Sequence, residues 1–131
     1  MLFRSFLVVD IGGGSTEFVI GHRNVEKAKS VNIGCVRMSE RHFKSDPASQ
    51  EEIEAARKDI QAAIAEAASI VDIKSAKSLI AVAGTATTVA AAALNLAEYD
   101  RYAIHLSRIS AEKTHQTAEM FLKMKIGRAH V

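Results

Sequence analysis

Asp10-Ile11-Gly12-Gly13-Gly14-Ser15-Thr16-Glu17 decides the fold, because this stretch joins two strand-like segments through a run of glycines. Phe6–Ile11 is a short apolar run with a carboxylate near its end, and it predicts a buried strand. Thr16–Gly21 is β-branched and aromatic and predicts a second strand. The glycines between them predict a turn with backbone angles that other residues seldom adopt. A third strand is expected over Val25–Ile33, so the chain begins with an antiparallel meander.

The same stretch predicts a phosphate site. Successive glycines let several backbone N–H groups point at one spot, and such a nest binds phosphate oxygens. Ser15 and Thr16 add hydroxyl donors, and Asp10 at the end of the first strand can hold Mg²⁺. Glu17 lies across the turn, where its carboxylate is expected to approach the same cation. A glycine-rich hairpin without a ligand is the alternative.

Two other glycine motifs fit poorly. A dinucleotide-binding loop needs a helix directly after its glycines, whereas a strand-like run follows them here. A Walker-type loop ends in Gly-Lys-Ser or Gly-Lys-Thr, which the sequence lacks.

Helices are expected further along the chain. Ser49 and Glu52 form a capping box, and apolar residues then recur with helical spacing over residues 50–72. Residues 35–45 have a mixed pattern, and residues 97–109 are expected to be a loop with a short extended piece. Ser110 is expected to cap a last helix that ends near Lys123.

A second glycine feature lies between a strand and a helix. Ser78–Ala83 predicts a strand that Gly84 and Thr85 end, and the Ala-rich stretch Thr85–Leu96 predicts a packed helix. Because helix N-termini attract anions, this junction is a second candidate phosphate site. Thr85 as an ordinary helix cap is the alternative.

Composition narrows the function classes. The 131 residues carry a net charge of only +2, which gives no reason to expect nucleic acid or a membrane surface as partner. The longest strongly apolar stretch, Ala86–Leu96, is too short to cross a bilayer. The single cysteine, Cys35, excludes an internal disulfide and is expected to be a buried thiol in a cytoplasmic protein. Asp59 and Glu66 are expected to be solvated on the polar face of their helix.

Both ends of the chain are predicted to be translated sequencing adapter. Residues 1–5 and 126–131 back-translate to opposite strands of one adapter sequence. Residues 6–125 are then the natural segment, and the excess of basic over acidic residues disappears once Arg4 and Arg128 are left out. A natural basic tail is the alternative.

The two glycine features, in this order, resemble the Ppx/GppA phosphatases, a family of exopolyphosphatases and guanosine pentaphosphate phosphohydrolases in the actin-like ATPase superfamily. The resemblance covers nearly all of residues 6–125 and rests on residues 8–17, 33–40 and 81–85. It implies an α/β, RNase H-like (actin-like ATPase) fold with an antiparallel meander at its start and packed helices. Residues 6–125 are then an incomplete second domain of a two-domain protein.

The resemblance also implies roles for individual residues. Asp10 and Glu17 match positions that bind Mg²⁺ or another divalent cation, and Glu17 also positions the attacking water. Gly84 and Thr85 match a motif on the far side of the cleft. The phosphate-binding turn corresponds to Gly12, Gly13, Gly14 and Ser15, followed by Thr16. The general base belongs to the missing N-terminal domain.

The implied function is hydrolysis of the terminal phosphoanhydride of inorganic polyphosphate, of pppGpp or of both by the intact protein. The fragment alone is expected to be inactive, because it lacks the general base. Two alternatives stay open: a regulatory module that binds phosphate or nucleotide without turnover, and another ATPase of the superfamily, which the Gly-Gly-Gly-Ser-Thr-Glu form disfavours. Arg37 either contacts polyphosphate or pairs with Glu40. The missing domain is an expected partner, and a homodimer is one candidate assembly.

Overall fold

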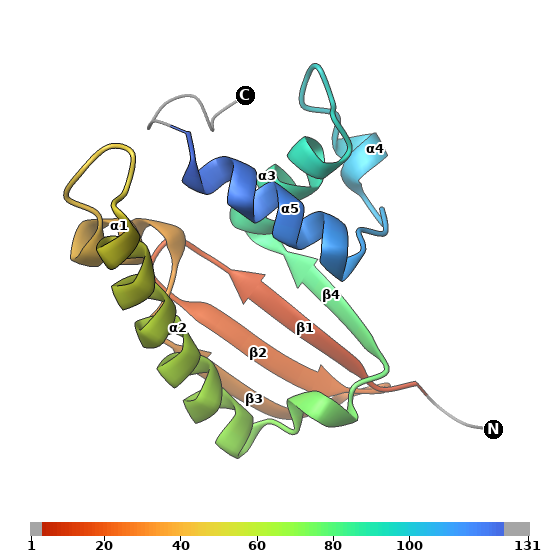
Figure 1. Ribbon diagram of the computed structural model, residues 1–131. Helices are drawn as coiled ribbons and strands as arrows, with labels where there is room; N and C mark the ends of the chain where they lie inside the picture. The colour runs from red at the N-terminus through yellow and green to blue at the C-terminus, as the bar shows by residue number, and fades with distance from the viewer. Residues whose placement is uncertain (1–3, 125–131) are drawn as a thin grey trace.

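A four-stranded mixed sheet organises the chain. The computed structural model describes residues 4–124, so residues 1–3 and 126–131 of the predicted adapter sequence lie outside the described residues. The strand order is β3-β2-β1-β4. The strands β1 (Phe6–Ile11), β2 (Thr16–Gly21) and β3 (Val25–Val31) form the predicted antiparallel meander, and β4 (Ser78–Val82) pairs with β1 in parallel (Figure 1). The third strand is two residues shorter than predicted.

Different strands of this sheet contact different helices. The long helix α2 (Gln50–Ile70) runs along the sheet and contacts β3 (Figure 1). The helix α3 (Ala83–Ala93) contacts β1 and β4, and α5 (Ala111–Leu122) packs on α3. Within residues 4–124, no helix combines the length and the apolar composition that crossing a bilayer requires.

Side-chain alternation divides the sheet into two faces. Leu7 and Val9 of β1 are buried together with Phe18 and Ile20 of β2, in a core that also takes in residues of α1 and α2. The intervening positions of both strands point to the opposite face of the sheet. The candidate cation ligands, at residues 10 and 17, occupy those intervening positions.

Two short helices differ from the sequence predictions. Helix α1 (Cys35–His42) forms where the sequence pattern was mixed, and its N-cap, Gly34, has no side chain to mark the start. Helix α4 (Arg101–Ile104) replaces the predicted extended piece, because the Asp100 carboxylate accepts hydrogen bonds from two amides of its first turn. A 3₁₀ turn, η1 (Ile73–Ser75), follows α2.

The helix caps at Ser49 and Ser110 are confirmed. Ser49 Oγ accepts from the Glu52 amide at 3.2 Å, and the Glu52 carboxylate accepts from the Ser49 amide at 2.8 Å. Ser110 Oγ accepts from the Lys113 amide at 3.0 Å. The helices end at Ile70 and Leu122, slightly earlier than predicted.

An ionic cluster ties the end of α1 to α2. Asp59 Oδ2 lies 2.6 Å from Arg41 Nη1 and 2.8 Å from His42 Nε2. The hydrogen bond from His42 lowers the pKa of Asp59 most, and the hydrogen bond from Arg41 lowers it further. The expectation that Asp59 is simply solvated is therefore wrong, and so is the expectation of a buried Cys35, which is exposed.

Glu52 should make the chain sensitive to acid. Hydrogen bonds from the Ser45 hydroxyl and from the Ser49 and Lys44 amides lower the Glu52 pKa from 4.5 to about 2. A carboxyl group whose pKa is depressed by folding stabilises the fold above its unfolded pKa, and this contribution is lost as pH falls toward the folded pKa. We expect the melting temperature of Glu52→Gln to fall less than that of the wild type between pH 4.5 and pH 2. The neighbouring variant Glu51→Gln is the control, and equal acid losses in all three proteins would contradict the assignment.

Candidate functional site

Parallel pairing of β1 with β4 brings the two glycine features to one edge of the sheet. Asp10 pairs with Val82, so the turn that follows β1 lies beside the start of α3 that follows β4. Gly84 and Thr85 were expected on the far side of a cleft, but they lie on the same side as the turn because adjacent strands are only about 5 Å apart. Open α/β sheets bind ligands outside the carboxyl ends of their parallel strands.

Helix α1 holds the glycine turn by its carbonyl groups. The Gly12 carbonyl accepts from the Cys35 amide at 3.3 Å, and the Gly13 carbonyl accepts from the Arg37 amide at 3.0 Å. The Gly14 carbonyl accepts from Arg37 Nε at 2.6 Å. The first amides of a helix have no partner within it, so those of α1 are available for the turn. All three glycine carbonyls therefore point at α1.

The amides of the turn consequently point the other way. In a trans peptide the C=O group and the following N–H group point in opposite directions, and these peptide bonds are trans. The N–H groups of Gly13, Gly14 and Ser15 are thus directed away from α1, and within residues 4–124 none of them has an acceptor. The Ser15 hydroxyl also has no hydrogen-bond partner among those residues. Adjacent unpaired amides of this kind form an anion-binding concavity.

Gly12 and Thr16 were predicted to contact phosphate, but the Gly12 amide and the Thr16 hydroxyl already donate to other groups of the chain. The Gly12 amide already donates to the Ser15 carbonyl at 2.9 Å, so Gly12 contributes an anchored carbonyl and no free donor. Thr16 is buried, and its hydroxyl donates to the Ile33 carbonyl at 2.7 Å. The side chain of Thr16 faces the core because side chains alternate along β2.

At the contact between the turn and α1, glycine is required at residue 34. None of Gly12, Gly13 and Gly14 has φ in the left-handed region, so the predicted unusual angles are absent. A Cβ on Gly34, however, would stand 2.5 Å from the carbonyl oxygens of both Gly12 and Gly13. Gly34 therefore allows α1 to approach the turn, a role that sequence reasoning missed although residue 34 belongs to one of the motifs.

Asp10 and Glu17 lie directly opposite each other in the β1–β2 ladder. Opposed residues of an antiparallel pair have Cβ atoms roughly 4.5–5.5 Å apart on one face. Glu17 Oε2 accepts from Ser30 Oγ at 2.6 Å, whereas the Asp10 carboxylate makes no hydrogen bond or ion pair with another described residue. Like charges placed opposite each other destabilise a sheet, so the pair needs a counter-charge.

The pair fits a magnesium ion. Mg²⁺ usually takes one or two carboxylates together with water and substrate phosphate oxygens. Within residues 4–124 there is no cluster of three or more His, Cys, Asp and Glu residues that could hold a metal.

The start of α3 lacks a side-chain cap. Its N-cap is Val82, and Thr85 lies inside the first turn, so the alternative that Thr85 caps the helix is wrong. Ala83 has φ of 78°, which costs a residue with a Cβ about 1–2 kcal/mol. A Cβ on Gly84 would meet nothing within 4 Å, so this backbone is open to a ligand. Backbone strain such as that at Ala83 is common at functional sites.

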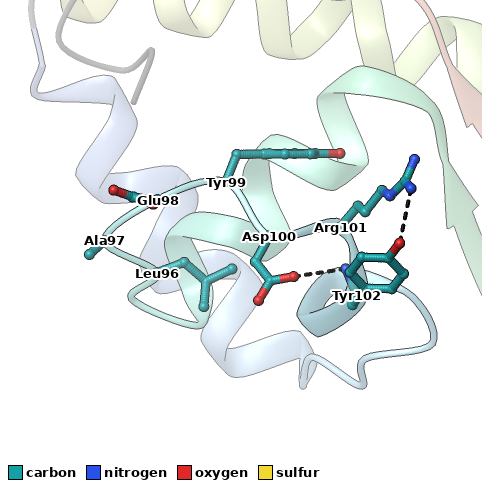
Figure 2. Close-up of a pocket in the computed structure, with 7 residues that line it drawn as sticks. All are labelled: Leu96, Ala97, Glu98, Tyr99, Asp100, Arg101 and Tyr102. Carbon is teal, nitrogen blue, oxygen red and sulfur yellow. Dashed lines mark hydrogen bonds between the residues drawn. The ribbon is translucent and has the colours of Figure 1, made fainter.

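The surface of residues 4–124 has hollows of different size. One of about 190 Å³ adjoins the turn and is lined by Gly13, Gly14, Val36, Arg37 and Glu40. A larger one of about 670 Å³ is lined by residues 96–102, from the connection between α3 and α4 and the start of α4, where Arg101 Nη2 donates to the Tyr102 hydroxyl (Figure 2). None of the predicted site residues lines the larger hollow.

Comparison with known proteins gives consistent matches. The model of the Ppx/GppA phosphatase family matches residues 3–130. Exopolyphosphatase 2 of Mycobacterium tuberculosis is 39% identical over 119 residues, which are 91% of this chain and 37% of that protein. The guanosine-5'-triphosphate,3'-diphosphate pyrophosphatase of Pseudoalteromonas atlantica is 49% identical over 51 residues, which are 38% of this chain and 10% of that protein.

Solved structures agree on the fold. A crystal structure of an exopolyphosphatase-like protein has a TM-score of 0.91 and 43% identity, covering 95% of this chain and 41% of that one. The Aquifex aeolicus Ppx/GppA phosphatase has a TM-score of 0.82 and 28% identity, covering 95% of this chain and 40% of that one. The predicted α/β fold is confirmed, and the chain spans about two fifths of the length of these structures. With the family model matched from residue 3 to residue 130, this chain belongs to the Ppx/GppA phosphatase family.

Proposed function

We propose that the intact protein hydrolyses the terminal phosphoanhydride of inorganic polyphosphate, of pppGpp or of both. The observation that carries this proposal is the group of three unpaired amides, at Gly13, Gly14 and Ser15, next to the opposed carboxylates of Asp10 and Glu17. The names of two relatives, an exopolyphosphatase and a guanosine-5'-triphosphate,3'-diphosphate pyrophosphatase, support both substrates.

The residues of this chain have distinct roles in that reaction. The terminal phosphoryl group lies against the amides of Gly13, Gly14 and Ser15, which are oriented before the charge of the transition state develops. Glu17, held by the Ser30 hydroxyl, orients the attacking water. The general base lies in a part of the protein outside this chain, and Gly84 and Thr85 offer a second anion-binding position.

Asp10 and Glu17 hold the divalent cation in this proposal. When bound, Mg²⁺ neutralises the phosphate oxygens and the leaving phosphate. The cytoplasmic location stays a prediction.

We also propose that the remainder of the protein covers β4. This strand lies at the edge of the sheet, and its apolar residues Leu79, Ile80 and Val82 are 65%, 41% and 36% exposed. An exposed apolar edge strand pairs readily with another strand, and natural proteins usually cover or charge such an edge. The relatives have about three fifths of their length outside the matched region, which supplies an occupant.

Activity of the complete protein tests the proposal. With Mg²⁺, it should release orthophosphate from long-chain polyphosphate or from pppGpp. Asp10→Ala and Glu17→Ala should each lower kcat about 100-fold or more, as the loss of a key electrostatic group does. Glu66→Ala, an exposed acidic residue of α2, is the matched control. Binding of either substrate without release of phosphate would favour the regulatory module, and turnover by this chain alone would refute the external base.

Thermal unfolding tests the cation site separately from catalysis. Asp10→Asn removes the repulsion between opposed carboxylates, so without metal its melting temperature should exceed that of the wild type by about 1–4 °C. Mg²⁺ should raise the melting temperature of the wild type and leave that of Asp10→Asn unchanged. Asp72→Asn, an exposed aspartate beside η1, should respond to Mg²⁺ like the wild type. A wild-type protein that ignores Mg²⁺ would rule out a cation site in this chain.

Gly34→Ala tests whether α1 orients the amides. The added Cβ would collide with the backbone of Gly12 and Gly13, and such overpacking typically costs about 1–3 kcal/mol. We expect lower stability in urea and at least tenfold weaker binding of inorganic phosphate by NMR titration. Gly84→Ala, where a Cβ meets nothing, should keep or raise the stability. Unchanged phosphate binding by a folded Gly34→Ala protein would show that α1 does not set the amides.

A further inference from the structure

We propose that Arg37 binds the second phosphoryl group of the substrate, and so makes this site select a phosphoanhydride chain over orthophosphate or a phosphate monoester. The inference rests on the proposed function, because it takes the terminal phosphoryl group to lie at the amides of Gly13, Gly14 and Ser15. It assigns substrate selection to a residue of α1 that lies outside the glycine turn.

Arg37 is fixed to the turn at two points. Its amide donates to the Gly13 carbonyl at 3.0 Å, and its Nε donates to the Gly14 carbonyl at 2.6 Å. A Cβ on Gly14 would stand 3.4 Å from Arg37 Nη2, so the guanidinium group lies directly against residue 14. The alternative that Arg37 pairs with Glu40 is not observed, because among the described residues no ion pair joins the two.

The guanidinium group keeps most of its donors free. Nε is engaged, whereas the N–H groups on Nη1 and Nη2 have no acceptor within residues 4–124, and the side chain is exposed. Guanidinium stays protonated, and its planar donors match two phosphate oxygens at once. Because the turn already fixes one of its N–H groups, Arg37 loses less conformational entropy on binding than a free side chain does.

The hollow beside the turn gives the second phosphoryl group its place. The hollow has a volume of about 190 Å³, and Gly13 and Gly14 of the turn and Arg37 of α1 line it. Gly14 borders both places, because its amide is one of the free amides and it lines the hollow together with Arg37. A Cβ on Gly14 would stand 3.4 Å from Arg37 Nη2, so the absence of a side chain leaves room between the turn and the guanidinium group. Orthophosphate has no second group to place there.

Glu40 lines the same hollow and opposes an anion. Its carboxylate lies one helical turn beyond Arg37, and the backbone carbonyl of Glu40 accepts from Lys44 Nζ at 2.6 Å. The carboxylate itself repels a phosphate chain that continues along α1. Removal of this charge should therefore strengthen binding of the second phosphoryl group, which is the opposite of the effect expected at Arg37.

The test compares orthophosphate with pyrophosphate on the whole 131-residue chain. Binding is followed by NMR at the amides of residues 13–15, at constant free Mg²⁺ and constant ionic strength. In Arg37→Gln the preference for pyrophosphate over orthophosphate should fall about tenfold, which corresponds to about 1.4 kcal/mol. Affinity for orthophosphate should fall less than affinity for pyrophosphate, because Arg37→Gln removes the anchor on the Gly14 carbonyl for both ligands but the free guanidinium donors only for pyrophosphate. Glu40→Gln should increase the preference, and Arg57→Gln, an exposed arginine of α2, should leave it unchanged.

The outcomes separate this inference from the proposed function. An Arg37 that only positions the turn would weaken both ligands equally in Arg37→Gln, and this result would overturn the inference while the phosphate site stands. An unchanged preference in Arg37→Gln would overturn it as well. If orthophosphate and pyrophosphate both fail to shift the amides of residues 13–15 in the wild type, the phosphate site itself is wrong and the role of Arg37 falls with it.

Discussion

Three backbone carbonyls anchored on one short helix set the geometry of the candidate site. A run of three glycines loses more conformational entropy on ordering than any other tripeptide, so it needs outside contacts to hold one shape. Helix α1 supplies them at Gly12, Gly13 and Gly14. Because each peptide unit carries its carbonyl and its amide on opposite sides, fixing the carbonyls on α1 also directs the amides away from it. The candidate anion-binding concavity is thus formed without a ligand, so a phosphate bound there would need little further ordering of the turn.

The position of α1 depends in turn on packing that is remote from the turn. Gly34 allows the backbone contact at the start of α1, and Asp59 holds Arg41 and His42 at its end. Glu52 fixes the segment that connects α1 and α2, because its carboxylate accepts hydrogen bonds from Lys44, Ser45 and Ser49. The core on one face of the sheet therefore supports a site whose carboxylates lie on the other face.

Local signals made the strands and the long helix predictable, and contacts between distant residues explain what was missed. An apolar run predicts β1, β-branched and aromatic residues predict β2, and the Ser49 capping box predicts the start of α2. Helix α1 lacks such a mark, since its N-cap is a glycine and Arg37 meets its partner in the turn 23 residues earlier. The motif identifies Ser15 and Thr16 together, but only the strand register shows that the Thr16 hydroxyl faces the core. Asp59 likewise meets partners 17 and 18 residues away, which helical periodicity does not show.

The site gathers groups that a ligand can pair. Amides at residues 13–15 lack acceptors, the carboxylates of Asp10 and Glu17 oppose each other, and Ala83 holds a strained angle beside them. An anion alone would satisfy the amides but would be repelled by the carboxylates, and a cation alone would satisfy the carboxylates but leave the amides unpaired. A phosphate bound to a divalent cation brings a negative and a positive group together, and both can be placed at one edge of the sheet. The pairing of amides with carboxylates therefore favours a metal–phosphate complex over either ion separately, and this is the form in which phosphoanhydrides are hydrolysed.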